Sequence, residues 1–541
     1  MKPLPTNPNI DQLKRQAKDL LNAVRRHNAD AMARFRTSLP EAAGKSAEYL
    51  AQLRLHDAQS CVARDYGFAS WAALRDFVEL SRARLSNPAE LAANFARLAY
   101  AGDVAGGMDR SKPDQAVRYL ALLLEQGPLD PWIACAAGEI SIIQRQLVND
   151  PAWIAKAGGP LNLPPLVAAT HSGLIQLPEH RTGIHGIVGL LLEAGADPNQ
   201  SVASRWPPAS LSEPSRDHRL SALYGAAGVN HNADVTRLLL DAGADPNDQE
   251  SLYHALESTD ATIVRLLLDA GAIVSGTNAL YHALDYDQLD TFQLLLSRTE
   301  TLNEQDMGPL LLWAIRRRRS VAHIESIIGA GADPAAKAKD GTSAFILALR
   351  QGLPELAAFL KRAGVAEEPS EADLFVAACA TANAEETRRL QTRNPNFPYV
   401  LEDAQLSMFS ELAAEGCNEA VKLMAELGWP IDVCGGDWDA SALNQAVFRG
   451  DAALAETLLS HGARWTEQHG YGDNVCGTLS WASLNQPKPE GDWVACAKVL
   501  VTYGMPGAAR NPEDPKTVLI DGQPCRFSEE VTDYLLSVGD M

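Results

Sequence analysis

Two histidines stand in near-identical surroundings and are the first residues to consider for chemistry. His254 lies in ESLYHAL and His282 in NALYHAL, so each follows a tyrosine at the same place in a repeated stretch. A metal-binding or pH-sensing histidine needs a carboxylate partner, and the spacing identifies none for either residue. We therefore expect a column of partly exposed surface histidines on neighbouring helices.

The clearest carboxylates have a structural explanation. Asp197, Asp245 and Asp333 each follow a Gly-Ala pair and precede a proline, which is a turn sequence. We expect turn-forming aspartates rather than general acids. The sequence contains no HExxH, GxSxG, P-loop, GxGxxG or kinase signature, and its eight cysteines form no CxxC pair. The pattern predicts buried thiols, no metal site, no cofactor and no catalytic residues.

One dense cationic run stands out in an otherwise acidic region. The stretch WAIRRRRS spans Trp313 to Ser320 and falls on a predicted turn between two helices. A nucleic-acid or targeting role is one interpretation of such a run. A solvated turn that pairs with neighbouring acidic loops is the interpretation we favour.

The elements that would position these residues repeat along the chain. Leu190–Asn199 reads LLLEAGADPN and Leu238–Asn247 reads LLLDAGADPN. The leucines predict a helix, the glycine a left-handed helix end, and the following residues a turn. The glycine recurs at Gly195, Gly243, Gly271, Gly331, Gly364, Gly428, Gly462 and Gly504. Most of the intervals lie near a period of about 33 residues or its double, and degraded copies end near Thr299 and Asn394.

A second landmark recurs in phase with the first. The stretches PPLVAA, SALYGAA, ESLYHAL, NALYHAL, SAFILAL and SALNQAV are weakened versions of T-P-L-H-x-A, the opening of an ankyrin repeat. Ser221, Ser343 and Ser441 are predicted helix caps in place of threonine. On these motifs the sequence resembles the ankyrin-repeat family over roughly residues 91–541. The family's histidine is replaced by Tyr, Val, Ile or Asn, so we expect irregular units stabilised by stacking.

The resemblance implies an all-α fold, an ankyrin-repeat solenoid of stacked helix-turn-helix units with long hairpin-like loops. We expect about 10–12 units over residues 91–541, divergent at both ends, with a Pro- and Ser-rich inserted loop at about residues 200–220. Residues 1–90 differ: apolar positions from Ile10 to Val24 fall on one helical face, and Gly67 and Ser70 mark a helix end and a cap. This segment resembles the leader of many bacterial ankyrin-repeat proteins, and we expect a small helical cap.

Composition limits the partners and the location. The chain has 541 residues and a net charge of −21, which disfavours nucleic acid as a ligand. It has no long apolar run and no secretory leader, so we expect a cytoplasmic protein without a membrane segment. We also expect a monomer.

The resemblance further implies a concave face, made of turn tips and first helices, that binds proteins. Large aromatic residues and an arginine occupy variable positions of that face, and such residues are typical interface anchors. The candidate protein-binding residues are Tyr286, Trp313, Trp438, Phe448, Arg449 and Trp481. We therefore expect a non-enzymatic scaffold for a protein partner whose identity the sequence does not reveal. The alternatives are an enzyme with a site in the inserted loops or the N-terminal cap, and a secreted host-directed effector.

Overall fold

Most of the chain folds into helices joined by short turns, as the periodicity predicts. The computed structural model describes residues 2–5, 8–39, 42–53, 55–84, 86–107, 110–206, 213–215, 217–299, 304–514 and 517–539. Internal contacts divide the chain into a first unit, residues 1–248, and a second unit, residues 249–541, and each is described by itself.

The elements of the first unit are α1 (Ile10–Arg25), α2 (Ala29–Ser38), α3 (Ala47–Ala51), α4 (Leu55–Asp65), α5 (Trp71–Ala83), α6 (Pro88–Ala99), α7 (Gly102–Ala105), α8 (Pro113–Gln126), α9 (Pro131–Ala137), α10 (Ile140–Asn149), α11 (Pro165–Thr170), α12 (Pro178–Glu193), β1 (Ser201–Ala203), β2 (Arg219–Ser221), α13 (Ala222–Tyr224) and α14 (Ala233–Asp241). The elements of the second unit are α15 (Ser251–Ala255), α16 (Thr262–Asp269), α17 (Ala279–Asp285), α18 (Leu289–Ser297), α19 (Glu304–Arg316), α20 (Val321–Gly329), α21 (Ala344–Arg350), α22 (Pro354–Arg362), α23 (Glu371–Ala380), α24 (Ala384–Arg393), α25 (Asp403–Leu406), α26 (Met408–Ala414), α27 (Asn418–Glu426), β3 (Cys434–Gly435), β4 (Ala440–Ser441), α28 (Ala442–Phe448), α29 (Ala452–Ser460), α30 (Val475–Asn485), α31 (Trp493–Thr502), β5 (Ala509–Arg510), β6 (Val518–Ile520), β7 (Gln523–Cys525) and α32 (Glu529–Gly539).

The first helices of the chain enclose a core of their own. Residues of α1 to α5 between Leu13 and Val78 form one buried apolar cluster, which includes Leu20 and Phe35. The predicted apolar face of α1 is the face that is buried. The hydroxyl of Ser70 accepts a hydrogen bond from the Ala73 amide at 3.1 Å and caps α5, as the sequence predicts.

A short hairpin occupies the ends of the expected inserted loop. Strands β1 and β2 pair antiparallel, with Ser201 opposite Ser221 and Ala203 opposite Arg219. Residues 207–212 and 216 of the expected insertion lie outside the described residues. The hairpin leads directly into α13, because the Ser221 hydroxyl accepts a hydrogen bond from the Tyr224 amide at 2.8 Å.

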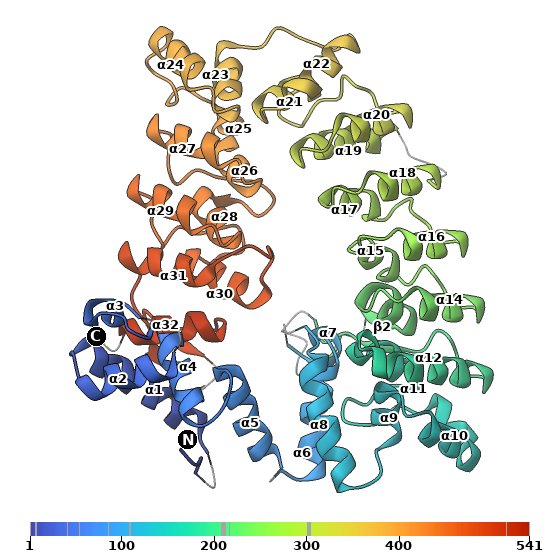
Figure 1. Cartoon of the computed structure of the whole chain (residues 1–541). Coiled ribbons are helices and arrows are strands. Elements are labelled where there is room, and N and C mark those ends of the chain that lie inside the picture. Colours follow the sequence, from blue (N-terminus) through green and yellow to red (C-terminus); the bar gives the residue numbers. More distant parts are fainter. Residues whose placement is uncertain are drawn as a thin grey trace. The chain divides into compact units, whose positions relative to one another are not determined.

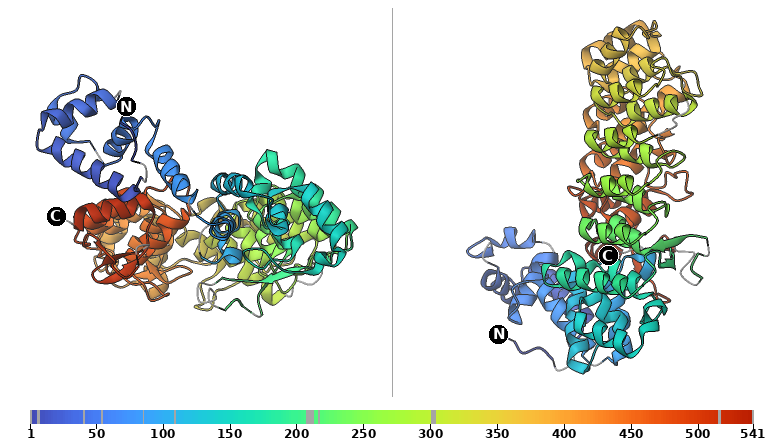
Figure 2. Two further views of the ribbon diagram at one scale, coloured as in Figure 1. Left: turned by 90° about the horizontal axis from the view of Figure 1, so that it is seen from below. Right: turned by 90° about the vertical axis from the view of Figure 1, so that its right-hand side faces the viewer.

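The second unit is a succession of stacked helix pairs. The first helices α15, α17, α19, α21 and α23 each contact the next one, and α26 contacts α28, which contacts α30 (Figure 1). The second helices α27, α29 and α31 also contact in series, to the left of α26, α28 and α30 in Figure 1, and the stacking is seen again in Figure 2. Each pair therefore buries its apolar surface against the pairs before and after it.

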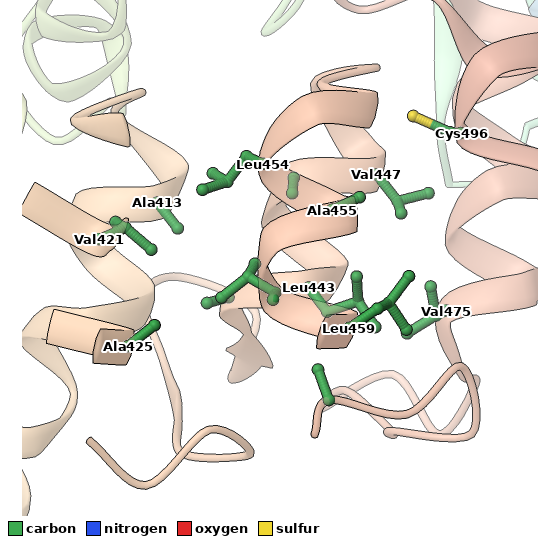
Figure 3. Packing of buried hydrophobic residues seen from close by; sticks show 14 of the residues in the cluster. Ala413, Val421, Ala425, Leu443, Val447, Leu454, Ala455, Leu459, Val475 and Cys496 are labelled. Atoms are coloured by element: carbon green, nitrogen blue, oxygen red, sulfur yellow. The ribbon is translucent and has the colours of Figure 1, made fainter. Parts of the chain in front are cut away.

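The core of the second unit runs between helix pairs rather than inside one of them. In Figure 3, Val421 of α27 and Leu454 of α29 point into the layer between their pairs, and Val447 and Val475 fill the next layer. All four side chains are fully buried. Small residues such as Ala413 and Ala455 let adjacent helices approach closely.

The predicted helix ends are confirmed. All eight recurring glycines have a positive φ, from 79° at Gly428 to 111° at Gly331, which is the left-handed conformation that ends a helix. Ser343 and Ser441 accept hydrogen bonds from the amides three residues later, at 3.2 Å and 3.3 Å. The predicted turn aspartates also behave as expected, since Asp197 accepts a hydrogen bond from the Asn199 amide at 2.9 Å.

The fold is mostly helical, as expected, and short strands lie between some of the helices. Strands β3 and β4 form a two-stranded hairpin ahead of α28, and β5, β6 and β7 form a three-stranded antiparallel sheet ahead of α32. This sheet buries Val518 and Ile520 at the C-terminal end of the core.

Among the helices described, none is long and apolar enough to cross a membrane.

Candidate functional site

Three of the candidate binding residues lie in direct contact. Trp438 is in the turn between β3 and β4, Phe448 ends α28, and Trp481 is in α30. The ring centroids of Trp438 and Phe448 are 5.7 Å apart. Phe448 and Trp481 are stacked, at 5.4 Å and an angle of 10° between their planes. The structure thus brings together side chains from successive repeats.

Two rings that sequence reasoning missed extend this group. His469 lies edge-on to Trp438 at 5.1 Å, and Tyr471 lies edge-on to His469 at 6.0 Å. The backbone explains the contact, because the Gly470 amide donates a hydrogen bond to the Trp438 carbonyl at 2.9 Å and joins the two turn tips. We call Trp438, Phe448, His469, Tyr471 and Trp481 the aromatic row.

The aromatic row is open to solvent at two of its members. Trp481 is 39% exposed and Tyr471 is 82% exposed. Trp438, Phe448 and His469 are partly buried. Exposed ring surface that is held rigid by ring-on-ring contact is suited to bind a partner with little loss of side-chain freedom.

Arg449 follows Phe448 but is directed to the preceding repeat. Its Nη1 donates a hydrogen bond to the Ala414 carbonyl at 3.2 Å. The guanidinium also fills the space beside Gly416, where a Cβ atom would collide with it. This side chain is tied to the end of α26, so the structure gives it a role in joining repeats.

The remaining two candidates lie in a second group, one at the end of α17 and one on α19. Tyr286, just after α17, packs edge-on against His282 at 5.3 Å, and Trp313 of α19 packs edge-on against Tyr281 at 6.1 Å. The guanidinium of Arg317 lies 4.1 Å above the ring of Trp313.

The two repeated histidines belong to a chain of alternating imidazoles and carboxylates, which we call the histidine column: His254, Glu257, His282 and Asp285. His254 Nδ1 lies 2.7 Å from Glu257 Oε1, and His282 Nδ1 lies 3.3 Å from Asp285 Oδ2. The Glu257 carboxylate also approaches His282 Nε2 at 3.8 Å. His282 is also stacked on Tyr253, with ring centroids 3.8 Å apart.

Our expectation for these histidines was therefore wrong in two respects. His282 is buried, and both imidazoles have carboxylate partners. The signal was present in the sequence, since Glu257 and Asp285 each follow their histidine by three residues, the spacing that places two side chains on one helix face.

The pKa values in the histidine column are shifted toward the charged forms of its side chains. Burial of the His254 imidazole opposes protonation, but hydrogen bonds to Glu250 and Glu257 outweigh burial and raise its pKa to about 9. Burial of Glu257 favours the neutral acid, and the bonds to His254 and His282 outweigh this and lower its pKa to about 2. The pKa of His282 is raised in the same way, against the effect of burial, by Asp285 and Glu257.

The cationic run pairs with acidic side chains, as we predicted. Arg319 Nη1 lies 3.3 Å from Asp287 Oδ1, and Arg317 Nε lies 2.8 Å from Asp285 Oδ1, both in the neighbouring repeat. Arg317 also pairs with Asp437 and lies 3.8 Å from Glu415, which come from far along the chain. The sequence could not reveal these distant partners.

A polar cavity of about 200 Å³ lies between α5, α6 and α8 in the first unit. Its lining includes Asp76, Glu79, Arg97 and Tyr119. The Asp76 carboxylate is paired with Arg118, so it serves as an ion-pair partner. Within the described ranges there is no group of three or more His, Cys, Asp or Glu residues placed to hold a metal ion.

Comparison with known families agrees with this geometry. A family model described as ankyrin repeats (3 copies) matches residues 222–306, which include α15 to α18 and the histidine column. No curated protein matches the chain. Ankyrin repeats are modules of protein–protein interaction, so the match indicates a protein-interaction region in this part of the chain.

Proposed function

We propose that this chain is a non-enzymatic scaffold that binds a partner protein through the concave face of an ankyrin-repeat solenoid. The observation that carries the proposal is the aromatic row, in which rings from two successive first helices and two turn tips form one partly exposed surface. The second group, with Tyr286 and Trp313, lies on first helices of earlier repeats in the same unit.

The physical argument rests on the type of side chain and its placement. Aromatic residues carry most of the binding energy at protein interfaces when they are rigid and surrounded by water-excluding neighbours. The stacked pair of Phe448 and Trp481 is rigid, and the turn tips that carry Trp438 and His469 are joined by backbone hydrogen bonds. A partner would gain contact area here without ordering new loops.

The rest of the proposal concerns organisation. We assign residues 1–90 to a helical cap, on the strength of their own apolar core, and residues 91–541 to the repeat array. We also propose that the protein is a cytoplasmic monomer without a cofactor. Its eight cysteines are free thiols, which is typical of a reducing compartment. The Asp76 carboxylate in the polar cavity forms an ion pair with Arg118, which supports a structural role for this acid.

Affinity capture from the native lysate tests this function. The wild-type chain should retain a stoichiometric protein partner, and the double variant Trp438→Ala with Phe448→Ala should lose it. The matched control is Tyr503→Ala, since Tyr503 is as exposed as Trp481 but lies at the C-terminal end of the second helix α31. Circular dichroism on both variants checks that they remain folded. Retention of the partner by the double variant, or absence of any captured protein, would overturn the proposal.

A further inference from the structure

Within the second unit, the contacts of Arg317 show how this protein surrounds a guanidinium group. The guanidinium carbon of Arg317 lies 4.1 Å from the centre of the Trp313 ring. Carboxylates surround the cation: Asp285 at 2.8 Å, Glu415 at 3.8 Å, and Asp437 in direct contact. An aromatic ring beneath a guanidinium with carboxylates at its edge satisfies both the face and the donors of an arginine.

The aromatic row also combines aromatic rings with nearby carboxylates, and it can present them to a ligand from outside the chain. Trp438 stands between Asp437 and Asp439, and Asp473 follows Tyr471 by two residues. All three aspartates are exposed. Asp437 belongs both to the surroundings of Arg317 and to those of the aromatic row, because it pairs with Arg317 and directly precedes Trp438.

The local charge favours a cationic ligand. Residues 434–485, which carry the whole row, contain six carboxylates and two arginines but no lysine. One of these arginines, Arg449, is bonded to the Ala414 carbonyl, and the other, Arg464, follows the second helix α29. The exposed carboxylates of Asp439 and Asp473, next to the rings in sequence, therefore favour a basic segment over an acidic one.

We infer that the partner presents an arginine-rich basic segment, and that its guanidinium groups stack on the aromatic row. The inference rests on the proposed function and specifies the chemistry of the partner. Arginine is favoured over lysine because its planar guanidinium is weakly hydrated, stacks on a ring and donates to two carboxylate oxygens at once.

A peptide titration tests the inference on the full chain. The probe is a labelled peptide of alternating arginine and glycine, and its lysine and glutamate counterparts are the comparisons. Fluorescence anisotropy should show the arginine peptide binding about tenfold more tightly than the lysine peptide, and no binding of the glutamate peptide. Equal affinity for arginine and lysine would overturn the inference, because simple charge attraction would then suffice.

Variants locate the site. Trp438→Ala with Trp481→Ala should reduce affinity for the arginine peptide about tenfold, whereas Tyr503→Ala should leave it unchanged. Trp438→Phe with Trp481→Phe keeps flat rings and should retain most of the affinity, which separates loss of stacking from loss of fold. Asp439→Asn with Asp473→Asn should weaken binding and reduce its dependence on salt. Full affinity in the double alanine variant would overturn the inference.

Competition separates this inference from the proposed function. The arginine peptide should displace the protein partner captured from lysate. If the partner is captured and lost in the ring variants but the peptide does not displace it, the inference fails and the scaffold function stands. If the peptide binds as expected but no protein is captured, the function fails and the arginine chemistry of the row stands.

Discussion

The histidine column shows how single residues give this repeat array a pH-dependent element. His254 and His282 each lie between carboxylates, and the two repeats share Glu257. Because His254 keeps its proton to a pKa of about 9, the column is an ion pair rather than a neutral contact at physiological pH. It therefore contributes electrostatic attraction between α15 and α17.

The first prediction concerns the pH range of this attraction. The pKa of His254 is raised from 6.5 to about 9, so its contribution is complete below pH 6.5 and is lost as pH rises through 9. The pKa of Glu257 is lowered from 4.5 to about 2, so its contribution is complete above pH 4.5 and is lost as pH falls through 2. The column stabilises the fold most between these limits, by about 0.5–1 kcal/mol because it is partly exposed.

Thermal unfolding measures this effect. At about pH 6 the wild-type chain should melt at a higher temperature than His254→Ala, and the difference should be smaller near pH 10, where the ion pair is lost and only the packing of the ring remains. The control is His461→Ala, whose ring bonds to Ser460 and Thr457 instead of a carboxylate. A melting difference for His254→Ala that is the same at both pH values would contradict the assignment.

A second residue-scale prediction concerns the pair of Arg350 and Asp373, both nearly buried between α21 and α23. Arg350 Nη2 and Nε lie 2.7 Å and 2.8 Å from Asp373 Oδ1. Arg350→Met leaves the carboxylate with Ser370 and Gln405 but no cation, and should lower the free energy of unfolding by about 3 kcal/mol. Urea unfolding tests this value.

The exposed pair of Arg389 and Glu386 provides the comparison, because its partners lie on the surface of α24. Arg389→Met should leave the urea midpoint almost unchanged. Similar midpoints for Arg389→Met and Arg350→Met would mean that burial does not govern the Arg350 pair.

At the scale of elements, turn glycines fall into two classes. Gly450, after α28, has a φ of 71°, and a Cβ atom there would lie 2.5 Å from the Gly491 Cα atom. Gly462, after α29, has a φ of 102° and open space around it. Alanine at either position costs about 1–2 kcal/mol for the left-handed backbone, and at Gly450 it must also displace the loop that carries Gly491.

We therefore expect Gly450→Ala to lower the melting temperature clearly more than Gly462→Ala does. Differential scanning calorimetry on the two variants makes the comparison directly. Equal melting temperatures would show that the loop around Gly491 yields without penalty.

Whether the sequence predicted an element depends on how far apart along the chain the interacting residues lie. Helix ends at Gly195 or Gly462 and caps at Ser221 or Ser441 depend on residues within one turn, so their spacing reveals them. The sheet of β5, β6 and β7 depends on pairing between two- and three-residue segments, which carry no periodic signal. Local rules cannot find such a sheet.

The sequence likewise identified some residues of the candidate site and missed others. Phase within the repeat identified Trp438, Phe448 and Trp481, because equivalent positions of stacked repeats are neighbours. It missed His469 and Tyr471, whose place is set by the hydrogen bond between two turn tips rather than by a helix. Only the folded structure shows that these loops meet.

At the scale of the whole molecule, one cluster departs from the rule that repeats depend on their neighbours. Stability of stacked repeats is ordinarily a sum of each unit and its adjacent interfaces. Arg317, at the end of α19, instead pairs with Asp437, 120 residues away, and with Glu415 at the end of α26. This cluster links repeats within the second unit that stacking alone does not bring into contact.

Replacing Arg317 should therefore raise amide hydrogen exchange in the repeats on both sides of this cluster. In Arg317→Gln, amide hydrogen exchange should rise in α17 and α19 and also in α26 and the turn of β3 and β4, because Asp437 and Glu415 lose their shared cation. Each partly exposed pair is worth about 0–1 kcal/mol, so exchange should rise severalfold at most. The control is Arg298→Gln, whose partner Asp269 lies 2.7 Å away in the preceding repeat, and its effect should stay local. Exchange that rises only around α19 and α20 in Arg317→Gln would show that the distant pairs carry no coupling, and that the second unit unfolds repeat by repeat.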